Sequence, residues 1–108
     1  SIDLSNNCLN IVFEKFNSSK FKNIKEIRLS NTSLIDLKIL NLDTFKNLEI
    51  LDLSLNDLNY SFSRLNLSNK MREINMSFTG LDRLEIFDFN KMKILISIDL
   101  KGNRLKYI

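Results

Sequence analysis

The stretch LEILDLSLNDL, residues 48–58, decides the fold of this chain. Its apolar residues follow the spacing Leu-x-x-Leu-x-Leu-x-x-Asn-x-Leu, along which we number positions one to eleven. Leu51 and Leu53 alternate with polar residues, which is typical of a short strand buried on one face. Four more stretches follow the pattern: IDLSNNCL (2–9, truncated at its start), IKEIRLSNTSL (24–34), MREINMSFTGL (71–81) and LISIDLKGNRL (95–105).

The stretches recur at a nearly constant spacing. The fourth positions are Ile2, Ile27, Leu51, Ile74 and Ile98, which are 25, 24, 23 and 24 residues apart. Connections of this length are too long for hairpins, so they predict parallel pairing of successive strands. Each repeat then buries against its neighbours an apolar face that it cannot bury alone.

The pattern resembles the leucine-rich repeat family from end to end of the chain. Its period and pre-strand phenylalanines are similar to the extracellular type, as in Toll-like receptors and secreted invertebrate leucine-rich immune proteins, although the chain has no proline and no cysteine caps. The resemblance implies an α/β-type solenoid, a horseshoe segment with a parallel concave β-sheet and mostly irregular or 3-10 convex loops. It also implies protein–protein recognition in innate immunity.

Residues 1–108 are expected to form a single solenoid of about five repeats. The first stretch begins on a strand, and the chain stops three residues after Leu105. Solenoids need terminal repeats with a polar outer face, and none is recognisable in the sequence. We therefore expect a segment of a longer array, whose uncapped ends would allow self-association.

The ninth position of each stretch is expected to form a structural ladder in the turns. An asparagine amide both donates and accepts hydrogen bonds, and a threonine hydroxyl does so with one donor fewer. These side chains would satisfy backbone groups that the turn leaves inside the stack. Replacing the central one by leucine should cost about 1–3 kcal/mol. The ladder comprises Asn7, Thr32, Asn56, Thr79 and Asn103.

The return segments between the stretches carry a second apolar set. We interpret it as a core spine rather than a ligand-binding box, because large aromatic side chains dominate cores. Ser68 interrupts the large side chains that precede each strand, and Leu65 or Leu67 is expected to fill the gap. The set comprises Val12, Phe16, Phe21, Leu37, Leu40, Phe45, Leu65, Leu67, Leu84, Phe87 and Met92.

Composition argues against catalysis. The chain has no histidine, one cysteine and two glycines. These counts exclude a histidine triad, an internal disulfide, a Cys/His metal site and a glycine-rich phosphate loop. We predict no catalytic residue, no metal and no cofactor. Apolar runs such as residues 94–96 are far too short to span a membrane.

Positions three, five, seven, eight and ten are expected to face outward on the concave side. Positions three and five hold five carboxylates and one arginine, so this face is acidic although the chain carries a net charge of +3. An acidic face repels phosphate, which predicts a protein partner with a basic surface rather than nucleic acid. The candidate partner-binding residues are Glu26, Arg28, Ile50, Asp52, Leu55, Glu73, Asn75, Phe78 and Asp99.

Two features of this face each allow two interpretations. Arg28 lies between Asp3 and Asp52 in the predicted register, so these charges either serve binding or merely neutralise one another. Ile50, Leu55 and Phe78 are apolar where outward-facing residues are expected. They are either scattered surface hydrophobics or a small apolar anchor within a polar rim.

The compartment is predicted from glycosylation sequons. Five Asn-x-Ser/Thr sequons begin at Asn17, Asn31, Asn59, Asn66 and Asn75. Asn17, Asn59 and Asn66 are candidate glycosylation sites, whereas glycans at the other two would obstruct the concave face. The sequons favour a secreted, receptor-like glycoprotein. The alternative is a cytoplasmic scaffold or regulatory subunit, which a reduced Cys8 and unmodified sequons would favour.

Overall fold

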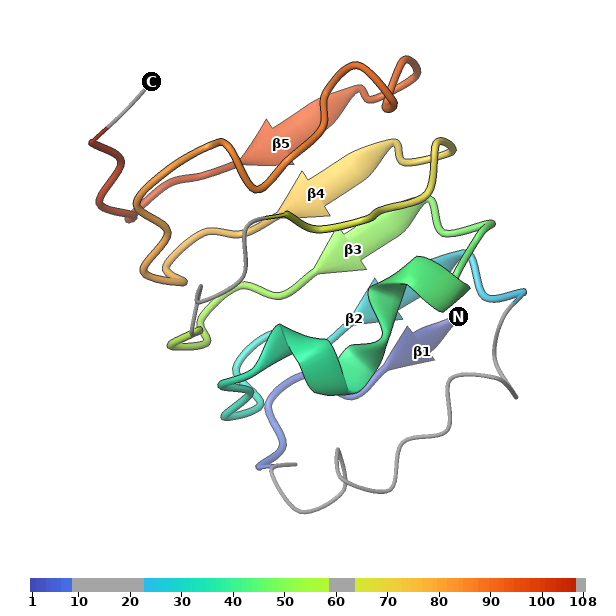
Figure 1. The fold of residues 1–108 in the computed structure, drawn as a ribbon. Coiled ribbons are helices and arrows are strands. Elements are labelled where there is room, and N and C mark those ends of the chain that lie inside the picture. The colour runs from blue at the N-terminus through green and yellow to red at the C-terminus, as the bar shows by residue number, and fades with distance from the viewer. Residues whose placement is uncertain (9–22, 59–63, 107–108) are drawn as a thin grey trace.

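The computed structural model describes residues 1–8, 23–58 and 64–106. One parallel sheet contains five strands in chain order (Figure 1). Ile27 pairs with Leu51, Leu51 with Ile74, and Ile74 with Ile98, so the predicted register is confirmed. The strands are β1 (Ile2–Asp3), β2 (Glu26–Arg28), β3 (Ile50–Asp52), β4 (Glu73–Asn75) and β5 (Ser97–Asp99).

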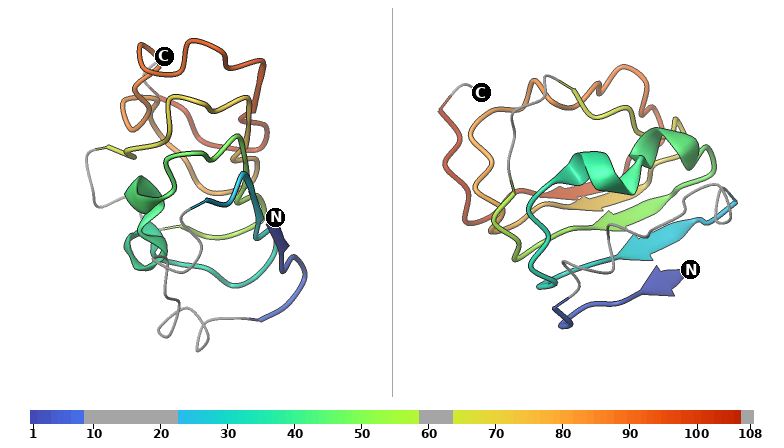
Figure 2. Two further views of the ribbon diagram at one scale, coloured as in Figure 1. Left: turned by 90° about the vertical axis from the view of Figure 1, so that its right-hand side faces the viewer. Right: turned by 60° about the horizontal axis from the view of Figure 1, so that its bottom comes forward.

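The described parts of the segments that return from one strand to the next lie over one face of the sheet. Between β2 and β3 the return contains two 3-10 helices, η3 (Leu37–Leu40) and η4 (Leu42–Thr44). Figure 2 shows these helices on one side of the sheet, while the other side is left open. We call the uncovered side the open face. Within the described ranges, no helix is long and apolar enough to cross a membrane.

The core lies between the sheet and the return segments. Leu53 and Met76, at position six of β3 and β4, are fully buried. Of the return-segment spine, Leu37, Leu40, Phe45, Leu65, Leu67, Phe87 and Met92 are buried as predicted, and Leu84 packs against them. Leu42 and Ile86 also belong to the core, although the sequence analysis did not select them. Val12, Phe16 and Phe21 lie outside the described residues.

Ser68 is accommodated in the core by hydrogen bonds. Its hydroxyl donates to the carbonyl of Lys46 (3.0 Å) and accepts from the amide of Lys70 (2.9 Å). A buried hydroxyl needs such partners, because desolvation without them costs free energy. Leu65 and Leu67 are both buried beside it, as the sequence predicted.

The two outermost strands are less well covered than the central ones. Leu4 is 37% exposed, and Ile98 and Leu100 are only partly buried. The prediction of a buried ladder at every position six is therefore wrong at Leu4. An outermost strand such as β1 has a paired neighbour on one side only, so its inward side chains lose half of their packing partners.

The backbone of the turns after the strands repeats closely. The amide at position eight donates to the carbonyl at position seven of the next stretch: Asn6 to Ser30, Asn31 to Ser54, Leu55 to Ser77 and Phe78 to Lys101, at 2.8–3.0 Å. The residue at position eight is left-handed in all five turns: Asn6 (φ 64), Asn31 (55), Leu55 (57), Phe78 (54) and Gly102 (71). The fold therefore fixes this conformation whichever residue occupies it.

Candidate partner-binding surface

The buried amide of Asn56 holds the turn after β3 to the preceding turn. Its oxygen accepts from the backbone amides of Thr32 and Leu34, both at 3.0 Å. Its nitrogen donates to the carbonyls of Leu29 and Leu53, both at 2.9 Å. Asn56 is 3% exposed, so these bonds satisfy groups that water cannot reach. The role predicted for position nine is therefore confirmed at this residue.

The ladder at position nine alternates between two kinds of link. Asn103 accepts from the amides of Thr79 (2.9 Å) and Leu81 (3.0 Å), as Asn56 does from the turn before it. Thr32 and Thr79 are fully buried, and their hydroxyls donate to the position-six carbonyl of their own stretch. Asn7 is exposed and donates to Leu4 and Ser5, so the prediction of a buried position is wrong there. Its turn follows β1, at the edge of the sheet.

The open face carries the two outward columns of the sheet. At position three Glu26, Ile50, Glu73 and Ser97 lie side by side, and at position five Asp3, Arg28, Asp52, Asn75 and Asp99 do so. These residues are half-buried or exposed, while the position-four residues between them point into the core. The acidic column pair predicted from sequence is therefore present on one face.

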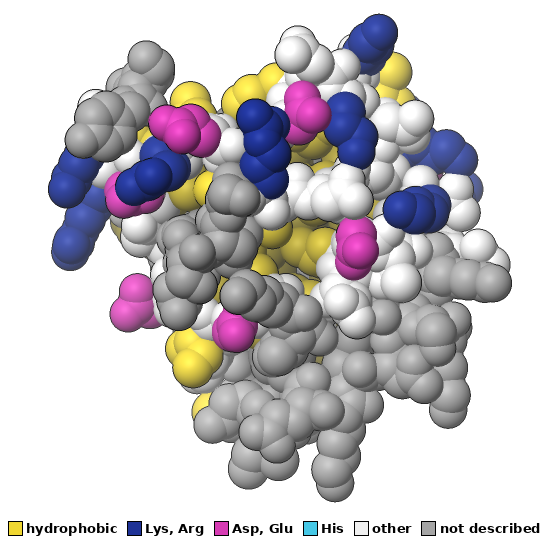
Figure 3. Space-filling model, viewed as in Figure 1, with side chains coloured by type: hydrophobic (Ala, Val, Ile, Leu, Met, Phe, Trp, Pro, Cys, Tyr) yellow, Lys and Arg dark blue, Asp and Glu magenta, His cyan; other side chains and the backbone are white. Residues whose placement is uncertain are grey.

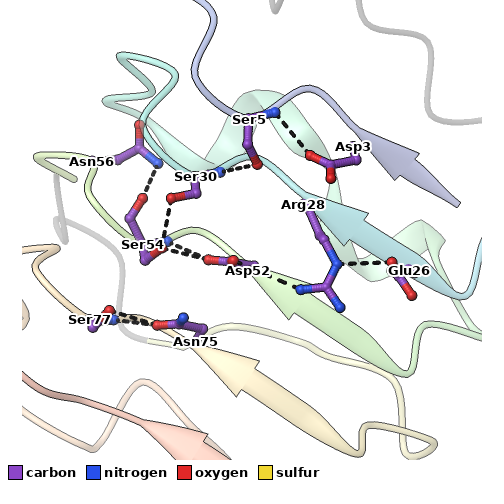
Figure 4. A network of polar contacts seen from close by, with 10 residues as sticks. All are labelled: Asp3, Ser5, Glu26, Arg28, Ser30, Asp52, Ser54, Asn56, Asn75 and Ser77. Carbon is purple, nitrogen blue, oxygen red and sulfur yellow. Dashed lines mark hydrogen bonds and ion pairs between the residues drawn. The ribbon is translucent and has the colours of Figure 1, made fainter.

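Arg28 is held by carboxylates on its own strand and on β3 (Figure 4). Its Nε donates to Glu26 at 2.9 Å, and its NH1 lies 4.0 Å from Asp52. The hydrogen bond to Glu26 raises the pKa of the guanidinium. The predicted order is confirmed, because Arg28 pairs in register with Asp3 on β1 and with Asp52 on β3. Its ion pairs are with Asp52 and, unexpectedly, with Glu26 of its own strand. Glu26 lies two residues before Arg28 on the same face of β2, so its carboxylate is within reach of the guanidinium.

Asp3 has a different partner. Its Oδ1 accepts from the backbone amide of Ser5 at 3.1 Å, and this bond lowers the pKa of the carboxyl. The charge of Arg28 lowers it further, as the smallest contribution. The carboxyl group of Asp3 is thus ionised at neutral pH.

The prediction that position seven faces outward is wrong at Ser54 and Ser77, whereas Lys101 is exposed as predicted. Ser54 and Ser77 are buried (5% and 6% exposed), because their hydroxyls donate to Asp52 (2.7 Å) and Asn75 (2.8 Å). Figure 4 shows the serines of successive turns linked sideways, with Ser30 bonded to Ser54 at 2.9 Å. These hydrogen bonds link neighbouring turns, while positions three, five and eight remain at least partly accessible to solvent.

Leu55 and Phe78 stand out at position eight. Leu55 is 53% exposed and Phe78 is 50% exposed, although both are large and apolar. A residue with a Cβ loses roughly 1–2 kcal/mol in the left-handed conformation, a cost that glycine avoids and asparagine reduces. These two residues therefore carry a backbone cost without a place in the core. Backbone strain of this kind concentrates at functional sites.

Leu55 and Phe78 line a shared hollow at the edge of the sheet where the strands end. The hollow is lined by Leu55, Asn56, Asp57, Phe78, Thr79, Gly80, Gly102 and Arg104, and we call it the edge hollow. A Cβ on Gly102 would lie 2.3 Å from Cδ1 and Cε1 of Phe78, so the ring rests directly on that glycine. The two apolar side chains are thus walls of one depression rather than isolated surface residues.

Ile50 does not belong to this cluster. It is half-buried at the start of β3, between Glu26 and Glu73 in neighbouring strands, whereas Leu55 lies beyond the end of β3. Of the three residues predicted to form one apolar anchor, only Leu55 and Phe78 lie together. Large apolar side chains that the sequence analysis did not select are also exposed: Ile35, Phe89, Ile94 and Ile96.

The face opposite the open face carries charges of both signs. Figure 3 shows Lys and Arg side chains gathered over its upper part, where the segments around β4 and β5 lie. Lys70 and Lys91 are exposed there and donate to Asn47 (2.7 Å) and Asn66 (2.8 Å). The net positive charge of the chain therefore coexists with an acidic open face.

The sequons lie in three settings. Asn66 is exposed on a return segment, and Asn31 is exposed at position eight, where its amide donates to Asn6 at 3.2 Å. Asn75 is half-buried on the open face and accepts from Ser77. Asn17 and Asn59 lie outside the described residues. Cys8 is exposed in the turn after β1.

Comparison with known proteins assigns no family. No protein-family model, curated protein or solved structure matches this chain. Within the described ranges, no three His, Cys, Asp or Glu side chains are grouped to hold a metal ion. The arrangement offers a hollow with two apolar walls beside an acidic face, which suits non-covalent recognition.

The left-handed conformation at position eight was not predicted from the sequence. A signal was present, since Asn6, Asn31 and Gly102 occupy this column and are the residue types that tolerate a positive φ. Leu55 and Phe78 are the two residues at position eight that tolerate a positive φ poorly. Their selection as candidate binding residues rested on polarity alone.

Proposed function

We propose that this chain is a leucine-rich repeat solenoid, a non-catalytic module that recognises a protein partner through its open face and the edge hollow. The internal spacing of the sequence and the parallel register of its five strands support the family assignment. In such a solenoid the strands line the concave side. A rigid array of strands presents side chains in fixed rows, which suits recognition of an extended surface.

The observation that carries the proposal is the exposure of Leu55 and Phe78 on left-handed backbone. Selection for stability alone favours asparagine or glycine there, as in the other three turns. A central apolar pair with a polar rim is the usual anatomy of a binding hot spot. We infer that binding maintains these side chains.

For the compartment we propose secretion, as a receptor-like glycoprotein in innate immunity, by resemblance and from the sequons. Asn66 is exposed on a return segment, away from the open face, so a glycan there would leave the open face accessible. The alternative, an intracellular scaffold, takes support from Cys8, whose thiol is exposed. Expression through the secretory pathway, with glycan occupancy at Asn66 measured by mass spectrometry, discriminates between them.

The experiment that tests recognition uses a displayed peptide library selected on the immobilised chain. Selected peptides should lose about tenfold or more in affinity for Phe78→Ala, because truncating a hot-spot residue has effects of this size. The unfolding free energy of Phe78→Ala should stay within about 1 kcal/mol of the parent value, because the ring is half exposed and alanine keeps the same left-handed cost.

Ile35→Ala is the matched control, since Ile35 is a large exposed apolar residue outside the edge hollow. It should leave peptide affinity unchanged. Peptides that bind Phe78→Ala as tightly as the parent would overturn the proposal. So would a labelled oligonucleotide that binds the open face and is released steeply by salt, because that behaviour marks nucleic-acid recognition.

A further inference from the structure

The floor and walls of the edge hollow favour one large apolar anchor. Leu55 and Phe78 form the walls, and Gly80 and Gly102 contribute no side chains. Gly102 is covered by the Phe78 ring, whereas over Gly80 the nearest atom to an added Cβ is Asp57 Oδ1, at 3.7 Å. The accessible part of the hollow therefore lies over Gly80, between apolar walls and beside a carboxylate.

One carboxylate, Asp57, lines the hollow, and further carboxylates lie on the adjoining open face. Glu26 and Asp52 are engaged with Arg28. None of the ion pairs among the described residues involves Asp57, Glu73 or Asp99. Glu73 and Asp99 lie on β4 and β5 of the open face, on the same strands whose turns carry Phe78 and Gly102. The open face therefore carries more carboxylates than its one arginine can pair with, although the charge of Arg28 also acts on Glu73.

Two cations border the same region. Arg104 lines the hollow at position ten after β5, and Lys101 is exposed at position seven. Both follow β5, the outermost strand, while the carboxylates extend from β3 to β5. The lining of the hollow therefore holds one carboxylate, Asp57, and one guanidinium, Arg104, while the adjoining open face carries mostly carboxylates.

We infer that the edge hollow binds a basic peptide segment, with one aromatic or branched side chain inserted over Gly80 and flanking Lys or Arg side chains against Asp57, Glu73 and Asp99. The inference rests on the proposed function and specifies the chemistry of its partner. Charge complementarity selects this occupant, because an acidic segment would meet Asp57 and the carboxylates of the open face, and like-charge contacts are strongly unfavourable. Apolar contact supplies the affinity, and charge supplies specificity and association rate.

The test uses three synthetic peptides of equal length: one with a tryptophan between lysines and arginines, one with the tryptophan replaced by glycine, and one with the basic residues replaced by glutamate. Binding is measured by fluorescence anisotropy at two salt concentrations. The first peptide should bind at least about tenfold more tightly than either of the others. Its association rate should fall with salt while part of the affinity remains, because apolar burial is insensitive to salt.

Variants on the rim give effects of opposite sign. Asp57→Asn should weaken the basic peptide about threefold to tenfold, and Arg104→Glu should strengthen it by a similar factor. Asp43→Asn is the control, since Asp43 is an exposed carboxylate in η4, on the return-segment side. It should change nothing. Folding of each variant is checked by its unfolding free energy.

Distinct results separate this inference from the proposed function. Library peptides that depend on Leu55 and Phe78 but lack basic residues would overturn the inference and leave the proposed function standing. Equal binding of the basic and acidic peptides, no response to Asp57→Asn, or no binding of the first peptide at about 1 mM would overturn it as well. Loss of all dependence on Leu55 and Phe78 would overturn both.

Discussion

The turns that follow β1 and β3 have similar backbones but different roles. Position eight is left-handed in both, with φ 64 at Asn6 and 57 at Leu55. Asparagine tolerates this conformation, and leucine does so only at a cost. Position nine is asparagine in both, yet Asn7 is exposed and Asn56 is buried. The comparison shows that the same residue at position nine differs in burial with its surroundings, whereas at position eight the backbone is the same and the residue differs.

The largest expected effect is a difference in stability between Asn56→Leu and Asn7→Leu. Asn56→Leu leaves the buried amides of Thr32 and Leu34 without acceptors, and each lost partner costs about 1–3 kcal/mol. We expect a loss of at least about 3 kcal/mol in the free energy of unfolding, measured by urea denaturation. Asn7→Leu should cost less than about 1 kcal/mol, because the carbonyls of Leu4 and Ser5 that it bonds lie in an exposed turn.

Similar losses for Asn7→Leu and Asn56→Leu would contradict the comparison, since they would mean that position nine acts by its chemistry and not by its burial. An intermediate loss is expected at Asn103. It makes the same bonds to Thr79 and Leu81 but is only half-buried.

The strands were predictable from sequence because their signal is periodic. A period of two in each stretch, repeated at near-constant spacing, leaves one register in which every Ile or Leu of position four faces inward. The same spacing predicted the role of Asn56. A polar residue that recurs at a fixed position among apolar ones is expected to hydrogen-bond backbone groups inside the stack. Paired positions three and five followed from the register alone.

The burial of residues in the return segments and of the serines in the turns could not be predicted, because their contacts do not recur at a regular spacing. The return segments differ in length and pattern, so Leu42 and Ile86 could not be distinguished from exposed apolar residues such as Ile35. Ser54 and Ser77 are buried by hydrogen bonds whose partners, Asp52 and Asn75, are two residues away. Polarity alone assigns such serines to the surface.

The second prediction tests whether the Phe78 ring rests on Gly102. Gly80→Ala and Gly102→Ala share a left-handed backbone, with φ 76 and 71, and should each lose about 1 kcal/mol for that reason. At Gly102 the added methyl group also meets the ring, which must swing away. We expect Gly102→Ala to lose about 1 kcal/mol more than Gly80→Ala in urea denaturation.

A double-mutant cycle isolates the contribution of the ring. In the Phe78→Ala background, Gly102→Ala and Gly80→Ala should destabilise the chain equally, because the clash is gone and only the backbone cost remains. An excess loss at Gly102 that persists without the ring would show that another contact is responsible.

The smallest expected effect has the opposite sign and addresses position eight directly. Leu55→Asn should raise the free energy of unfolding by about 0.5–1 kcal/mol, because asparagine relieves the left-handed strain and the exposed leucine contributes little to the core. The new amide would also extend the side-chain contact that Asn31 already makes with Asn6. Asn31→Leu is the matched reverse change and should lower stability by a similar amount. If Leu55→Asn instead destabilises the chain, Leu55 contributes to folding in a way that its exposure does not reveal, and its retention at position eight needs no binding partner to explain it.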